Sequence, residues 1–123
     1  MFSITVERYF WATHRIKLSD DRMESPHSHN WMVRAKISGE KLSQIQVVAD
    51  FNKVKRLLDE ITIDLQADGL LENQYFKDNS ATAEQVAKYI YEQLERKLPA
   101  DNKIEGITVT EEPGCSAEYR TSK

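Results

Sequence analysis

The sequence predicts an α+β fold, in which a four-stranded antiparallel sheet carries two helices on one of its faces. Three observations support this prediction. Segments rich in β-branched and aromatic residues, with loosely alternating polarity, lie near both ends of the chain. Two segments with apolar residues at helical spacing lie between them, and turn signals containing Gly or Pro separate the strands at each end. The predicted order of elements is therefore ββααββ.

Two strands are predicted in the N-terminal part of the chain, at residues 4–11 and 31–38. Both are rich in aromatic and β-branched residues, and His29 leads directly into the second one. Gly39–Lys41 is predicted to form the turn that follows. The short apolar run at 46–50 is interpreted as the end of a strand.

The first predicted helix runs from Phe51 to about Leu65, with Asp50 as a plausible N-cap. Its apolar residues recur at helical spacing, so one face of the helix should be buried. The residues of that face are Phe51, Val54, Leu58 and Ile61. Residues 66–80 are mostly polar and are predicted to form a loop.

The second predicted helix opens with Thr82–Gln85, which matches a capping box, and runs to about Leu98 before Pro99 stops it. Two further strands are predicted at residues 104–112 and 116–121, joined by a turn at Pro113–Gly114. A sheet of this kind leaves its edge strands unpaired. Pairing between subunits, and hence a homo-oligomer, is therefore expected.

Composition limits the classes of function. The length of 123 residues suits one domain, predicted at residues 1–123. A net charge of −3 gives no broad basic surface for nucleic acid, and no apolar run is long enough to span a membrane. The N-terminus has no signal-peptide pattern, and the single cysteine, Cys115, fits a reducing compartment. We therefore expect a cytoplasmic protein without nucleic-acid or membrane partners.

All three histidines of the chain, His14, His27 and His29, fall within a short stretch. Residues two apart on a strand share a face, so His27 and His29 can point the same way, and a neighbouring strand can bring His14 beside them. Three neutral imidazoles can form a zinc site that keeps one coordination position open. The alternative is three unrelated surface histidines, because His-x-His is a short and common motif.

Five motifs in the correct order and spacing extend this pattern over nearly the whole chain. They are Phe10-x-Ala12-x-His14-Arg15, His27-x-His29-Asn30, Val48-x-Asp50-Phe51, Ala81-Thr82-Ala83-Glu84, and Val109-x-Glu111 with Tyr119-Arg120. In these motifs the sequence resembles the 6-pyruvoyltetrahydropterin synthase / 6-carboxytetrahydropterin synthase family.

The resemblance implies a T-fold (tunnelling fold), in which subunits join their sheets into a barrel, usually a trimer that stacks into a hexamer. It implies Zn²⁺ held by His14, His27 and His29, and a pterin substrate anchored by Glu111, with the Thr82 region helping from a neighbouring subunit. A carboxylate can accept two parallel N–H bonds from the pterin edge. The alternatives are a solvated strand residue for Glu111 and simple N-capping for Thr82.

The chain departs from the usual family pattern at two places. Met23 stands where typical members carry a catalytic cysteine, and Glu24 follows it. This resembles the subgroup in which a glutamate replaces the cysteine, associated with cleaving the side chain of 7,8-dihydroneopterin triphosphate to 6-hydroxymethyl-7,8-dihydropterin, a folate precursor. Glu24 would then be the catalytic acid/base. The alternatives for Glu24 are a fourth zinc ligand and a surface carboxylate.

The second departure is the missing Asp-His pair that typical members carry between the helices, since the chain has no fourth histidine. Three other functions therefore stay open. One is the ordinary synthase chemistry, giving a 6-pyruvoyl product or the 6-carboxy product of the queuosine pathway. The others are a pterin-binding homologue without turnover and a zinc-stabilised structural barrel.

Overall fold

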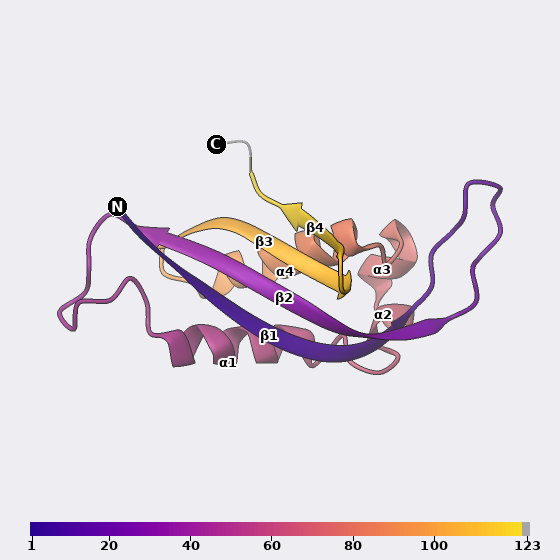
Figure 1. Cartoon of the computed structure of the whole chain (residues 1–123), viewed down its shortest axis with the longest axis horizontal. Helices are drawn as coiled ribbons and strands as arrows, with labels where there is room; N and C mark the ends of the chain where they lie inside the picture. Colours follow the sequence, from indigo (N-terminus) through magenta and orange to yellow (C-terminus); the bar gives the residue numbers. More distant parts are fainter. Residues whose placement is uncertain (122–123) are drawn as a thin grey trace.

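The computed structural model describes residues 1–121 and contains a sheet and four helices in that range. Figure 1 shows the long strands crossing the molecule, with α1 and α4 running beside the sheet and α2 and α3 near one end of it. The elements are β1 (Phe2–His14), β2 (His27–Gly39), α1 (Phe51–Thr62), α2 (Gly69–Glu72), α3 (Gln74–Asn79), α4 (Ala83–Lys97), β3 (Lys103–Glu112) and β4 (Cys115–Tyr119).

The sheet has the order β1-β2-β3-β4, and every neighbouring pair of strands is antiparallel. In the register of β1 with β2, His14 lies opposite His27 and Ala12 lies opposite His29. Side chains alternate between the faces of a sheet, so this register puts all three histidines on one face. The predicted α+β fold with a four-stranded antiparallel sheet is confirmed.

The core lies between one face of the sheet and the helices. Alternate residues of β1, β2 and β3 are buried there, and they meet the apolar faces of α1 and α4. The buried apolar strand residues are Val6, Phe10, Ala12, Trp31, Val33, Ala35, Ile37, Ile104, Ile107 and Val109. The histidines share this face, so the site begins where the apolar core ends. No helix within residues 1–121 is long and apolar enough to cross a membrane.

The prediction of a loop over residues 66–80 is wrong, because the segment forms the two short helices α2 and α3. Leu70 and Phe76 are buried there, so each helix is stabilised by one apolar anchor rather than by a long amphipathic face. The Asn73 side chain caps α3 by accepting a hydrogen bond of 2.8 Å from the backbone N–H of Tyr75. The sequence did not indicate these helices, because the segment is mostly polar and its few apolar residues form no clear helical pattern.

Several predicted boundaries also move. Strands β1 and β2 run further than predicted and include the histidines, whereas β4 begins at Cys115 and ends at Tyr119. Residues 46–50 form bends rather than a strand end. Helix α1 ends at Thr62, before the predicted Leu65. Phe51 is 54% exposed, since it lies at the start of α1, beyond the part of the helix that meets the sheet.

Candidate metal and substrate site

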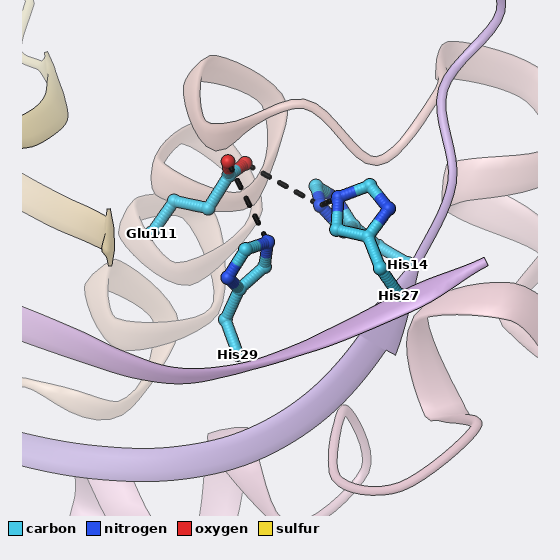
Figure 2. A group of neighbouring side chains, drawn as sticks. All are labelled: His14, His27, His29 and Glu111. Carbon is cyan, nitrogen blue, oxygen red and sulfur yellow. Dashed lines mark hydrogen bonds and ion pairs between the residues drawn. The ribbon is translucent and has the colours of Figure 1, made fainter. Parts of the chain in front are cut away.

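Four side chains converge at one end of the sheet. His14 ends β1, His27 and His29 open β2, and Glu111 lies near the end of β3. The antiparallel register brings these strand ends together, and Figure 2 shows the three imidazoles and the carboxylate pointing toward one another. Their candidate ligand atoms all lie within 4.8 Å of one another.

The distances within this cluster are short. Nε2 of His14 lies 3.0 Å from Nε2 of His27 and 3.4 Å from Oε1 of Glu111. Nε2 of His29 lies 3.6 Å from Oε2 of Glu111. The cluster therefore presents three imidazole nitrogens and one carboxylate to the same small volume.

The outer contacts of the rings fix which nitrogen carries a proton. Nδ1 of His14 lies 2.8 Å from the carbonyl oxygen of Ala81, and Nδ1 of His27 lies 3.0 Å from that of Ser25. A carbonyl oxygen only accepts, so both Nδ1 atoms donate, and in the neutral rings both Nε2 atoms present lone pairs. Two lone pairs that face each other at 3.0 Å repel unless a cation lies between them.

His29 gives independent support for a cation. Its Nε2 is buried and has no hydrogen-bond partner within the described residues 1–121. A buried polar atom without a partner is costly, and a metal ion would satisfy it. Nitrogen donors from three histidines suit zinc, so the residues present fit a metal of this class.

Burial keeps His14 in the form that binds metals. The residue is 1% exposed, and this burial lowers the pKa of its imidazole from the ordinary value of 6.5. The hydrogen bond to the Ala81 carbonyl and the charge of Glu111 oppose this effect, whereas His27 and His29 add to it. The neutral ring is thereby favoured, and a neutral ring is what a metal requires.

Glu24 lies beside the cluster, in the connection between β1 and β2. Its Oε1 is 3.7 Å from Nε2 of His27 and accepts a hydrogen bond of 3.1 Å from the backbone N–H of Ile16. The backbone N–H of Glu24 in turn donates to the carbonyl oxygen of Ile16 at 3.0 Å. These two hydrogen bonds hold the carboxylate next to the histidines, and Met23 pairs with Lys17 on the same connection.

Thr82 acts as the N-cap of α4, and its hydroxyl accepts a hydrogen bond of 3.2 Å from the backbone N–H of Gln85. The side chain of Gln85 accepts instead from the Tyr75 hydroxyl at 3.0 Å, so only half of the predicted capping box is seen. Sequence reasoning missed the neighbouring Ala81, which acts through its backbone carbonyl and so leaves no signal in the residue type. Ser80 precedes it with a φ of +71°, a strained conformation of the kind found at functional sites.

A cavity of about 520 Å³ adjoins this region. Its lining includes Ala81 and Met23, neighbours of the site, together with the cationic side chains of Arg15, Lys17 and Lys77. Asp78 is the one acidic residue among those that line it in the described part of the chain. The cavity therefore carries a positive balance and suits an anionic group.

The comparison with known families agrees with this geometry. Residues 3–122 match the family model of 6-pyruvoyl tetrahydropterin synthase. The chain belongs to this family. It is thus a pterin enzyme of a lyase family whose members are generally metal-dependent, and the predicted family resemblance is confirmed.

Related proteins cover nearly the whole chain. A Caenorhabditis elegans protein named "Putative 6-pyruvoyl tetrahydrobiopterin synthase" is 27% identical over 132 residues, which cover 95% of this chain and 94% of the relative. The solved C. elegans 6-pyruvoyl tetrahydropterin synthase has a TM-score of 0.79 at 24% identity, covering 99% of this chain and 98% of the other. The Plasmodium vivax enzyme has a TM-score of 0.75 at 18% identity and 96% coverage of both chains.

This family member has little to replace the Asp-His pair expected between the helices. The only histidines of the chain are the three in the cluster. In the region concerned, Ala67 pairs with β1, since its N–H donates to the Trp11 carbonyl and its carbonyl accepts from the N–H of Thr13. The backbone of this segment is thus fixed against the end of β1, and Asp64-Leu65 or Asp68-Gly69 occupies the region of the expected pair.

Proposed function

We propose that the protein is a zinc-dependent lyase that cleaves the side chain of 7,8-dihydroneopterin triphosphate or a related dihydropterin, with Glu24 moving the proton. The observation that carries this proposal is the convergence of three imidazole nitrogens with Glu24 placed 3.7 Å from His27. It joins a metal-binding arrangement to a candidate acid/base in one site.

His14, His27 and His29 would hold the metal. When bound, zinc would act as a Lewis acid that lowers the pKa of hydroxyl groups on the substrate. The carbonyl groups of Ala81 and Ser25 would orient two of these rings through their Nδ1 hydrogens.

Glu24 is the proposed base because it lies beside the histidines and has no competing cysteine next to it. It would take the proton of the second side-chain hydroxyl, after which the bond between the first and second side-chain carbons breaks and the proton returns to the first carbon. The products would be 6-hydroxymethyl-7,8-dihydropterin and a two-carbon aldehyde that keeps the triphosphate. In two structures of Plasmodium vivax 6-pyruvoyltetrahydropterin synthase, alanine or cysteine replaces a catalytic glutamate.

Substrate recognition would be shared between Glu111 and the region around Thr82. The Glu111 carboxylate would accept two parallel N–H bonds from the pterin edge. Arg15, Lys17 and Lys77 supply the positive charge that a triphosphate needs, in a cavity that borders the site.

Replacement of Glu24 by glutamine tests the proposal. Glu24→Gln keeps the size of the side chain but removes the base, so kcat should fall about 10²- to 10⁴-fold. Chromatography of the products from the zinc-loaded protein would measure it, with 6-hydroxymethyl-7,8-dihydropterin expected from the wild type. Asp20→Asn, an exposed carboxylate of the same connection, is the matched control. Unchanged turnover in Glu24→Gln would refute the proton-transfer role.

A pterin-binding protein without turnover is the second candidate. The absence of a fourth histidine favours it, because half of the usual proton-transfer machinery is missing. Recovery of bound pterin with no product from the wild type would select this alternative. A 6-pyruvoyl or 6-carboxy product would instead select the ordinary family chemistry.

A further inference from the structure

We infer that Glu111 is the fourth metal ligand before substrate binds, and that the pterin opens the site by drawing this carboxylate away. The inference deepens the proposed function and rests on it for the identity of the substrate. It gives Glu111 two successive partners, the metal and then the pterin.

The separation of the donor atoms supports a four-ligand site. Bonds of about 2.0–2.1 Å in a tetrahedral site place neighbouring donors about 3.3–3.4 Å apart. The Glu111 carboxylate lies 3.4 Å from Nε2 of His14 and 3.6 Å from Nε2 of His29, while the His14 and His27 nitrogens are 3.0 Å apart. These three distances are near that value, and all the candidate ligand atoms lie within 4.8 Å of one another, so small side-chain shifts would bring them around one ion.

Hydrogen bonding does not account for the position of Glu111. In its neutral form His14 donates through Nδ1 to Ala81, so its Nε2 has no proton to give to the carboxylate. The distance from His29 to the carboxylate also exceeds that of a hydrogen bond, and Nε2 of His29 has no such partner in residues 1–121. A carboxylate oxygen and the lone pair of His14 Nε2 that face each other repel unless a metal ion or an added proton lies between them.

Four protein ligands would close the site, whereas catalysis by zinc requires an open position. Glu111 is the ligand suited to leave. Its side chain is 25% exposed, whereas that of His14 is 2% exposed, and His14 and the more exposed His27 are both held from behind by backbone carbonyl oxygens. An incoming pterin edge offers the carboxylate two N–H donors in exchange for the metal. Recognition of the pterin ring would thus precede, and permit, binding of its side chain.

The first test needs no substrate. Zinc affinity is measured by chelator competition for the wild type, Glu111→Gln and Glu112→Gln, the last being an exposed carboxylate beside the first. Glu111→Gln should lose at least about tenfold in affinity, and Glu112→Gln should match the wild type. Visible absorption of the cobalt-loaded proteins, which reports coordination geometry, should change in Glu111→Gln alone. Equal affinity and an equal spectrum in Glu111→Gln would overturn the assignment.

A second variant and a pterin titration complete the test. Where Glu111→Gln does not fold, Glu111→Asp retains the charge on a shorter side chain, and its cobalt spectrum should still differ from that of the wild type. The opening step is tested by adding 7,8-dihydropterin, which has no side chain to cleave, to cobalt-loaded wild type. A changed spectrum is expected, and pterin binding with an unchanged spectrum would overturn the exchange. Failure of the pterin to bind would refute the substrate class and the exchange together, while the zinc affinities still decide the ligand assignment.

Discussion

His14 uses both nitrogens of its ring, one toward the backbone and one toward the cluster. Its Nδ1 contacts the carbonyl of Ala81, and its Nε2 faces His27 and Glu111. A residue with 1% exposure and these contacts has a single side-chain orientation available. His14 is therefore the fixed member of the site, around which the more exposed His27 and Glu111 are arranged.

The burial of His14 makes the metal-free protein sensitive to acid. Because burial lowers the pKa of its imidazole in the folded state, the unfolded chain binds more protons as the pH falls below about 6.5. The free energy of unfolding should therefore decrease as the pH falls from 6.5 toward the folded pKa. Urea unfolding of the metal-free protein at pH 7.5 and 5.5 should show a lower midpoint at pH 5.5.

The matched control for this acid effect is His14→Asn, which keeps a donor for Ala81 but does not titrate. The drop in the urea midpoint between the two pH values should be smaller in this variant than in the wild type. An equal drop in both proteins would show that other groups cause the acid sensitivity.

At the residue scale, spacing predicted part of the site. His27 and His29 are two apart before a strand, which is enough to expect a shared face. Glu111 was expected near the substrate, but its approach to the histidines depends on the pairing of β2 with β3 and could not be derived from its own segment. The support from Ala81 is a backbone contact and leaves no pattern in the sequence.

At the element scale, long segments with a clear period were predicted well. The four strands and the helices α1 and α4 occur where alternation or helical spacing indicated them, with boundaries shifted by a few residues. The helices α2 and α3 were missed because each depends on one buried residue, Leu70 or Phe76, which tertiary contacts supply. These two helices bear on the proposed function, since Lys77 of α3 lines the cationic cavity.

If the cationic cavity binds the triphosphate, replacing Lys77 should weaken the binding of substrates that carry this group. Lys77→Gln should raise the KM for 7,8-dihydroneopterin triphosphate by about tenfold, because a charged hydrogen bond to phosphate is lost. The KM for 7,8-dihydroneopterin, which has no phosphate, should change little. Steady-state kinetics with both substrates would measure the difference.

The matched control for the cavity is Arg22→Gln. Arg22 belongs to the same connection as Arg15 and Lys17, but it pairs with Asp20 at 2.6 Å and does not line the cavity. Its replacement should leave both KM values near those of the wild type. If KM for the triphosphate substrate rose as much in Arg22→Gln as in Lys77→Gln, the net charge of the protein rather than this cavity would attract the triphosphate.

At the scale of the whole molecule, the face of the sheet away from the helices is unusual. Tyr9 and Trp11 of β1 are 61% and 57% exposed, and β1 and β4 form the edges of the sheet. Exposed aromatic residues beside unpaired strand edges are typical of surfaces that pair with another subunit. The predicted homo-oligomer, a trimer or hexamer that closes the sheets into a barrel, is therefore retained as our proposal.

Light scattering coupled to size exclusion would measure the oligomer directly. The expected mass is three or six times the chain mass of 14.3 kDa. A monodisperse monomer at micromolar concentration would contradict the barrel. Trp11→Lys should shift the protein toward smaller species, because a charge is costly where an aromatic side chain is buried.

Residues 15–26 leave β1 directly after His14 and enter β2 directly at His27, so two proposed metal ligands stand at the two ends of this one connection. An ion bound there would join the two ends of the loop. It would reduce the conformational freedom of the loop, as a cross-link does. The same loop carries Glu24, Arg15 and Lys17. Loss of the ion would therefore loosen the proposed base and two of the cavity cations together, so chelation would remove chemistry and phosphate recognition in a single event.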